Sequence, residues 1–120
     1  MSKKRILLVD DEQIVKELTE TMLAALDHQV RSFEDAGEAL ALFGQDSSSF
    51  DLVITDQSMP CMTGVELAKK LKEIRPDLPV VISTGHSSQQ IEEQLDGLAG
   101  TYVLEKPFNL SQLEALIQSL

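Results

Sequence analysis

The chain has 120 residues, 42% of them hydrophobic and 25% charged, a size and composition that suit one compact domain with a single core. Its 20 acidic and 10 basic residues give a net charge of −10, which disfavours nonspecific binding to nucleic acid or to an anionic membrane. No apolar run approaches the roughly 20 residues of a membrane helix, and the one after the basic start is too short for a secretion signal. A single cysteine, Cys61, excludes an internal disulfide and fits a reducing compartment, so we expect a cytoplasmic location.

Five short apolar runs recur along the chain and predict β-strands. In chain order they are Ile6–Val9, the weaker Val30–Phe33, Leu52–Ile54, Val80–Ile82 and Tyr102–Leu104. The clearest runs are continuous, with no alternation of apolar and polar residues, as is typical of strands buried on both faces of a sheet.

Amphipathic stretches separate the apolar runs and predict helices. The expected inward-facing residues are Val15, Leu18, Met22 and Leu26; Ala36, Ala39, Leu40 and Phe43; Leu67, Leu71 and Ile74; Ile91, Leu95 and Leu98; and Leu110, Leu113, Leu116, Ile117 and Leu120. Thr63 and Glu66 form a potential capping box at the start of the third helix, and the pair Arg75-Pro76 is expected to end it.

The alternation of strands and helices predicts an α/β fold, (βα)5, with a doubly wound five-stranded parallel sheet. Parallel strands need right-handed crossovers, which place helices on both faces of the sheet. Ligands of such sheets bind beyond the carboxyl ends of the strands, where the strand order reverses. The residues that follow each strand are therefore the candidates for function.

Polar residues follow the strands at one edge of the predicted sheet. They are Asp10, Asp11 and Glu12; Glu34 and Asp35; Asp56; Ser83, Thr84 and Gly85; and Glu105 and Lys106. Each has an ordinary explanation when taken alone, because acidic residues cap helices and a polar residue in a loop is common. Only Glu34 and Asp35 look like an ordinary helix cap once the whole set is considered.

The remaining residues together suit the binding of a cation and a phosphoryl group. The acidic excess can be a solvated surface, but Asp10, Asp11 and Asp56 at one edge would repel each other unless a cation lay between them. Oxygen ligands with room for water suit Mg²⁺. Lys106 and Thr84 add a fixed charge and a hydrogen-bond donor, which suit a phosphoryl group, and a carboxylate can itself be the nucleophile. Asp56, on the central strand, is the expected acceptor.

These motifs resemble those of the receiver domain of two-component response regulators, over essentially the whole chain. The matching segments are Ile6–Glu12, Asp51–Asp56 with Met59-Pro60 and Gly64, Pro79–Gly85, and Lys106–Phe108. The resemblance implies a flavodoxin-like sheet with strand order 2-1-3-4-5. It also implies that residues 1–120 form a receiver domain without an output domain.

The resemblance implies a role for each site residue. Asp56 would be the phosphoacceptor, and Mg²⁺ would be bound by Asp11 directly, by Asp10 mainly through water, by Asp56 and by the backbone carbonyl of Ser58. Thr84 would turn its hydroxyl toward the phosphoryl group and Lys106 would pair with a phosphoryl oxygen. A cis peptide bond between Lys106 and Pro107 would aim the lysine.

The resemblance also implies the partners. The donor would be a phosphohistidine of a sensor histidine kinase or a histidine phosphotransfer protein. Phosphorylation would change the surface of the fourth helix, fifth strand and fifth helix, which would contact an output domain or effector, with the chain a monomer or a phosphorylation-dependent dimer. The chain would accept and slowly hydrolyse a phosphoryl group without being a dedicated enzyme, and it would bind no nucleic acid or membrane.

Some positions depart from the family pattern or tune it. Many receivers carry an aromatic residue where Val103 stands, and here the aromatic is Tyr102, one place earlier and expected on the opposite face of its strand. Ser58 and His86 are expected to flank the site. The segments Thr55–Thr63 and Ser83–Ser87 resemble receivers of hybrid sensor kinases more than those of transcription factors.

Two other functions use related chemistry. A haloacid-dehalogenase-type phosphatase also has an aspartyl nucleophile, but it needs a general acid where Ser58 stands. A flavodoxin-like cofactor binder would need a phosphate loop after the first strand, where Asp10, Asp11 and Glu12 would repel a phosphate.

Overall fold

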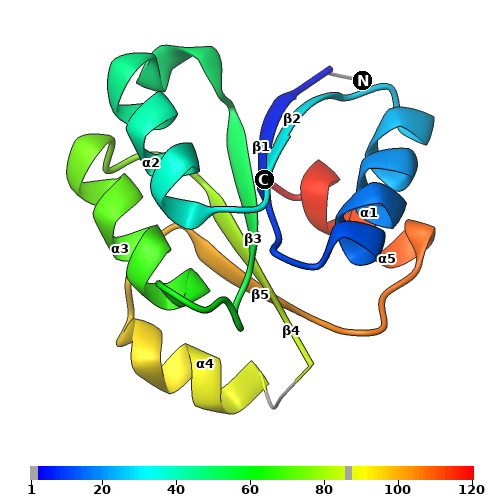
Figure 1. The fold of residues 1–120 in the computed structure, drawn as a ribbon. Helices are drawn as coiled ribbons and strands as arrows, with labels where there is room; N and C mark the ends of the chain where they lie inside the picture. Colours follow the sequence, from blue (N-terminus) through cyan, green and yellow to red (C-terminus); the bar gives the residue numbers. More distant parts are fainter. Residues whose placement is uncertain (1–2, 86–87) are drawn as a thin grey trace.

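A computed structural model of the chain describes residues 3–85 and 88–120. Five strands alternate with five α-helices, as predicted (Figure 1). The elements are β1 (Arg5–Val9), α1 (Gln13–Ala25), β2 (Gln29–Phe33), α2 (Ala36–Gln45), the 3₁₀ turn η1 (Ser47–Ser49), β3 (Leu52–Asp56), α3 (Gly64–Ile74), β4 (Val80–Thr84), α4 (Ser88–Leu95), β5 (Thr101–Glu105) and α5 (Leu110–Gln118). No helix in the described part of the chain is long and apolar enough to cross a membrane.

The five strands form one parallel sheet in the order β2-β1-β3-β4-β5, which confirms the predicted fold. The chain moves outward from β1 to β2 and then crosses to β3 on the other side of β1. This reversal brings the carboxyl ends of β1 and β3 together, because Val9 is paired with Thr55. The residues that follow Val9 and Thr55 therefore lie next to each other.

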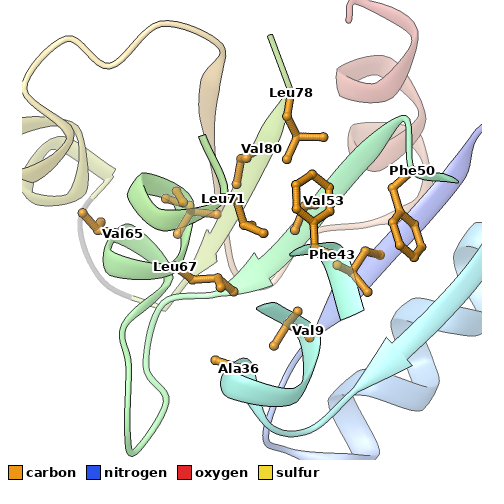
Figure 2. Close-up of a cluster of buried hydrophobic side chains, with 14 of the residues drawn as sticks. Val9, Ala36, Phe43, Phe50, Val53, Val65, Leu67, Leu71, Leu78 and Val80 are labelled. Carbon is orange, nitrogen blue, oxygen red and sulfur yellow. The ribbon is translucent and has the colours of Figure 1, made fainter. Parts of the chain in front are cut away.

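Side chains of each strand alternate between two apolar layers, which explains why the strand sequences are continuously apolar. Leu7, Val9 and Val53 pack against α2, α3 and α4, where Phe43 and Leu71 complete the larger layer (Figure 2). The smaller layer lies on the opposite face of the sheet, against α1 and α5, and it contains Ile6, Leu8, Leu23, Leu52, Ile54, Val81, Leu113 and Ile117. Figure 1 shows α1 and α5 together on one side of the sheet.

The predicted inward face of α1 was wrong at Leu18, whose side chain is 59% exposed. Thr19 and Leu23, one helical turn apart, are the buried residues of this helix. Leu18 instead shares an outward stripe with Ile14, which is 82% exposed. Ile74 and Leu110, also predicted to face inward, are partly exposed because they are the terminal residues of α3 and α5.

The predicted capping box of α3 is confirmed. The Thr63 hydroxyl accepts a hydrogen bond from the Glu66 amide at 3.1 Å, and the Glu66 carboxylate accepts one from the Thr63 amide at 2.9 Å. The helix ends at Ile74, before Arg75-Pro76, as expected. Asp35 caps α2 by accepting a hydrogen bond from the amide of Glu38, so its ordinary explanation was right.

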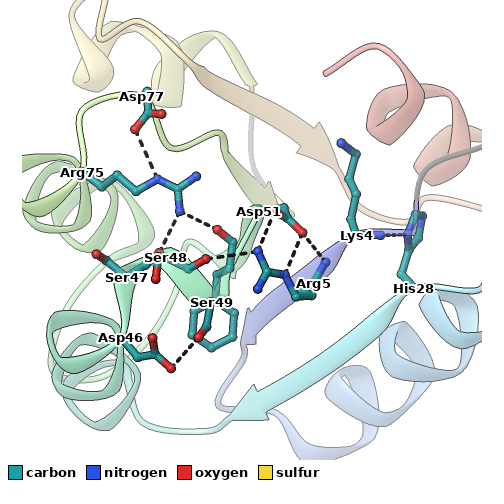
Figure 3. Close-up of polar contacts among 11 residues, drawn as sticks. Lys4, Arg5, His28, Asp46, Ser47, Ser48, Ser49, Asp51, Arg75 and Asp77 are labelled. Carbon is teal, nitrogen blue, oxygen red and sulfur yellow. Dashed lines mark hydrogen bonds and ion pairs between the residues drawn. The ribbon is translucent and has the colours of Figure 1, made fainter.

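Two arginines fasten the opposite, amino-terminal end of the sheet (Figure 3). Arg75 donates to the backbone carbonyls of Ser47 and Phe50, at 2.7 and 2.5 Å. Arg5 pairs with Asp51 and donates to it from both its backbone and its guanidinium. This hydrogen bonding, reinforced by the charge of Arg5, lowers the pKa of Asp51. The segment that leads into β3 is thus held from two sides.

Candidate functional site

Three carboxylates meet at the carboxyl edge of the sheet. Asp10 follows β1 directly and Asp56 is the last residue of β3, and both side chains are buried. Carboxylate oxygens of Asp10, Asp11 and Asp56 all lie within 4.8 Å of one another. The parallel pairing of β1 with β3 causes this proximity, because it aligns the two strand ends.

Lys106 brings a positive charge to the carboxylates from the end of β5. Its ammonium donates a hydrogen bond to Oδ1 of Asp56 at 2.7 Å and lies 3.8 Å from Oδ2 of Asp10. Burial acts to lower the pKa of Lys106, but the hydrogen bond to Asp56 and the charges of Asp56 and Asp10 outweigh it, so the pKa is raised. The peptide bond between Lys106 and Pro107 is cis, as expected.

Asp10 and Asp11 differ in how their oxygens are satisfied. Asp10 accepts a hydrogen bond from the Glu12 amide at 2.9 Å, in the turn before α1, and no side chain caps α1 itself among the described residues. Burial, opposed by this hydrogen bond but assisted by the charge of Asp56, raises the pKa of Asp10 from 3.8 to about 6. Asp11 caps nothing: its Oδ1 is buried and has no hydrogen-bond partner among the described residues.

The unpaired oxygen of Asp11 indicates that the residues of the site suit a metal ion. Buried polar atoms in folded proteins nearly always have a partner, and an unpaired one is costly. One carboxylate oxygen of Asp11 also lies within 4.8 Å of oxygens of Asp10 and Asp56, and hard oxygen donors of this kind suit Mg²⁺. The donor set therefore fits a divalent cation held by Asp10, Asp11 and Asp56.

Thr84 and Ser58, two further predicted residues, follow strand ends at the same edge of the sheet. Thr84 is the buried last residue of β4, and its backbone carbonyl accepts a hydrogen bond from the Lys106 amide at 2.7 Å. Ser58 is exposed on the loop between β3 and α3, one residue beyond the buried Gln57. His86, predicted to flank the site, lies outside the described residues.

Val103 and Tyr102 lie on opposite faces of β5, as predicted. Val103 packs against the layer formed with α2, α3 and α4. Tyr102 has the same strand parity as Leu104, which packs on the α1 and α5 side, and its ring is partly exposed. The position next to β4 on the α4 side is therefore occupied by an aliphatic side chain.

Sequence reasoning missed the role of Gln57, which lies against Gly64, the first residue of α3. The side-chain oxygen of Gln57 accepts a hydrogen bond from the amide of Val65 at 2.9 Å. A Cβ atom on Gly64 would lie 2.6 Å from the backbone oxygen of Asp56, so this position has no room for a side chain. A glutamine directly after a buried strand carries no recognisable signal, since exposed glutamines are common in loops.

A family model of the response regulator receiver domain matches residues 6–118. The chain belongs to this family. Receiver domains of this family are the signalling domains of two-component phosphorelays. The match favours the receiver interpretation over a haloacid-dehalogenase-type phosphatase or a flavodoxin-like cofactor binder.

Individual receiver proteins resemble the chain along nearly its full length. The response regulator receiver protein CpdR of Brucella abortus is 32% identical over 117 residues, which cover 98% of this chain and 96% of CpdR. The crystal structure of chemotaxis protein CheY4 from Vibrio cholerae superposes with a TM-score of 0.87 at 28% identity, covering 98% of both chains. Several other curated relatives are longer, and the chain spans about half (49%) of their length.

A further solved structure shares the fold at lower identity. It is the receiver domain of sensor histidine kinase PA1611 from Pseudomonas aeruginosa, with a TM-score of 0.85, 22% identity and coverage of 98% of this chain and 97% of that one. That receiver was crystallised with a magnesium ion coordinated in its active-site cleft.

Proposed function

We propose that this receiver domain is a Mg²⁺-dependent phosphoacceptor switch that takes a phosphoryl group onto Asp56. The donor is a phosphohistidine of a sensor histidine kinase or of a histidine phosphotransfer protein. The observation that carries this proposal is the 2.7 Å contact between Lys106 and Asp56 within a group of three carboxylates. The Lys106 ammonium and the acidic cluster at the end of the central strand are the groups that phosphoryl transfer to a carboxylate requires.

Mg²⁺ would be held by Asp10, Asp11 and Asp56, with the backbone carbonyl of Ser58 as a further ligand. The unpaired oxygen of Asp11 supports this assignment, and so does the magnesium ion of the PA1611 receiver, which shares the fold. When bound, the metal would neutralise the charge that accumulates on the transferring group.

Asp56, Lys106 and Thr84 each have a separate role in the proposed transfer step. An Asp56 carboxylate oxygen attacks the phosphorus, the P–N bond breaks, and the histidine keeps the electron pair and takes up a proton. Lys106 is already at the acceptor oxygen and pairs with a phosphoryl oxygen as the new bond forms. The Thr84 hydroxyl donates to another phosphoryl oxygen. Water later hydrolyses the acyl phosphate, so the chain is a slowly reset switch and not a dedicated enzyme.

The exposed apolar pair Ile14 and Leu18 marks the side from which a donor approaches. Both lie one helical turn apart on α1, which begins just after the acidic residues of the site. A phosphohistidine has to reach Asp56 at this edge, so its protein would cover the start of α1. Large exposed apolar residues beside a site are typical of protein docking surfaces.

Phosphorylation of Asp56 would change the surface of α4, β5 and α5 through contacts at the ends of β4 and β5. The Lys106 amide is bonded to the Thr84 carbonyl, and the Glu105 carboxylate accepts a hydrogen bond from the Ser88 amide at 2.9 Å. These contacts join the site to the first residue of α4. A displacement of Thr84 or Lys106 can therefore move α4 although Val103 replaces the usual aromatic residue.

Phosphorylation of the purified chain tests the proposal. Incubation with Mg²⁺ and acetyl phosphate is expected to add the mass of one phosphoryl group to the wild type and to Asp77→Asn, which replaces an exposed carboxylate far from the site. The variant Asp56→Asn is expected to gain none. No gain in the wild type, or an equal gain in Asp56→Asn, would refute the assignment of Asp56.

A further inference from the structure

Gln57, the residue directly after Asp56, is a buried polar side chain outside the expected receiver chemistry. It is 7% exposed, although it follows the end of β3. Its backbone amide donates to the carbonyl of Ser83 at 2.9 Å, which ties it to β4. Its two oxygens face the opposite way, toward the first turn of α3.

Gln57 satisfies two of the amides that open α3. The first amides of a helix have no partner within the helix and need an external acceptor. The amide of Gly64 donates to the Gln57 backbone carbonyl at 3.1 Å, and that of Val65 donates to the Gln57 side-chain oxygen at 2.9 Å. The next amide, of Glu66, is satisfied by Thr63. The start of α3 thus depends on Gln57 as much as on its own capping residue.

The fit between Gln57 and α3 leaves no room for adjustment. A Cβ atom on Gly64 would lie 3.1 Å from both the Cα atom and the side-chain oxygen of Gln57. The Val65 side chain is buried, so water cannot easily replace the lost acceptor at its amide. Removal of the Gln57 oxygen should therefore shift the first turn of α3 away from the end of β3.

We infer that Gln57 is a positioning residue that sets the metal affinity of the site by fixing both ends of the loop between β3 and α3. Ser58, whose carbonyl is a proposed metal ligand, is the next residue in this loop, so its path depends on the anchoring of Gln57. Outer-shell hydrogen bonds that orient metal ligands commonly control affinity in this way. The inference rests on the proposed function in taking Mg²⁺ as the bound ion and the Ser58 carbonyl as one of its ligands.

Three variants separate this role from a general effect on the fold. Gln57→Met keeps the length of the side chain but removes the strong acceptor. Gln57→Glu restores an oxygen at the same reach. Gln45→Met makes the same exchange at the exposed last residue of α2, at the opposite end of the sheet, and serves as the matched control.

Two measurements on the full chain are needed. Amide hydrogen exchange at Val65 is expected to speed up at least about tenfold in Gln57→Met and to return toward the wild-type rate in Gln57→Glu. The dissociation constant of Mg²⁺ alone, from isothermal titration calorimetry, is expected to rise roughly tenfold in Gln57→Met only. Phosphorylation by acetyl phosphate should then need more Mg²⁺ for half-maximal rate, while the rate at saturating Mg²⁺ stays within about twofold of the wild type.

The outcomes distinguish this inference from the proposed function. Faster exchange at Val65 with unchanged Mg²⁺ affinity would make Gln57 a purely structural residue and overturn the inference. Equal Mg²⁺ affinities of Gln57→Met and Gln45→Met would do the same, even with normal phosphorylation. A wild-type chain that binds Mg²⁺ without being phosphorylated would refute the proposed function, and the metal affinities of the variants would still decide the role of Gln57.

Discussion

Lys106, the residue after the edge strand β5, donates a hydrogen bond to Asp56 at the end of the central strand β3, 50 residues away in the sequence. The contact neutralises part of a cluster in which Asp10 and Asp56 are both buried. In the proposed transfer to Asp56, this positive charge would already lie beside the carboxylate when the phosphoryl group arrives. Electrostatic stabilisation of this kind needs little reorganisation during the reaction.

Replacing Lys106 by methionine is expected to slow phosphorylation by acetyl phosphate about 100-fold, because the charge that meets the transferred group is lost. The rate of mass gain at saturating Mg²⁺ measures the effect. Lys69→Met, which removes an exposed lysine of α3, should react at the wild-type rate. Equal rates for the two variants would show that Lys106 has no part in the transfer.

Asp10 should make the metal-free protein less stable as the pH rises. Its pKa is about 6 in the folded chain against 3.8 as the ordinary value, so the folded state holds the proton more strongly. The stability is therefore highest below the ordinary pKa and falls as the pH rises through both values. Between about pH 4 and pH 7 the loss should be about 2 kcal/mol.

Urea unfolding with EDTA, at several pH values, measures this effect. The difference in free energy of unfolding between Asp10→Asn and the wild type should grow by about 2 kcal/mol, in favour of the variant, from pH 4 to pH 7. The comparison cancels contributions of other groups, such as His28, whose pKa burial lowers. A difference that does not change with pH contradicts the raised pKa of Asp10.

Asp11 should be required for stabilisation by Mg²⁺. At a concentration 100 times its dissociation constant, a ligand of the folded state stabilises it by about 2.7 kcal/mol. The wild type and Asp77→Asn should show this gain in urea unfolding, and EDTA should abolish it. Asp11→Asn should lose most of the gain, because one of the three clustered carboxylates is replaced by a neutral amide. A full gain in Asp11→Asn would place the metal elsewhere.

Gly64→Ala should destabilise the protein by about 2 kcal/mol, since the new methyl group would lie 2.6 Å from the Asp56 carbonyl. Gly44→Ala is the matched control. It lies in α2, where Ile74, at 4.0 Å, is the one described residue that the added methyl group meets, and it should stabilise the helix by about 0.5 kcal/mol. Chemical unfolding compares the two, and an unchanged stability of Gly64→Ala would disprove the steric argument.

The double substitution of Ile14 and Leu18 by serine should slow transfer from a phosphohistidine donor about tenfold and leave the reaction with acetyl phosphate unchanged. The probe is the purified, phosphorylated histidine kinase that reacts fastest with the wild-type chain. Ile74→Ser, which removes an exposed apolar residue at the other end of the molecule, should have no effect. Loss of both reactions would point to damage of the site and not of a docking surface.

Chain order alone predicts much of this site, because parallel strands bring Asp10, Asp56, Thr84 and Lys106 to one edge whatever the details of packing. The contacts that depend on side-chain direction are harder to predict from the sequence. Leu18 fits the apolar spacing of α1 as well as Leu23 does, and only the position of α1 on the sheet decides which is buried. The partner of Gln57 lies beyond a loop whose path no local pattern determines.

The hydrogen bonds of Arg75 and Arg5 lie at the amino end of the sheet, away from the acidic cluster (Figure 3). They satisfy backbone carbonyls and close the entry to β3 without using any residue of the site. Substitutions at the carboxyl end therefore leave these contacts intact, even where, as at Gly64, they are expected to lower the stability. In the proposed switch, the residues that would set the rates of phosphorylation and hydrolysis can thus vary independently of the contacts that anchor the start of β3.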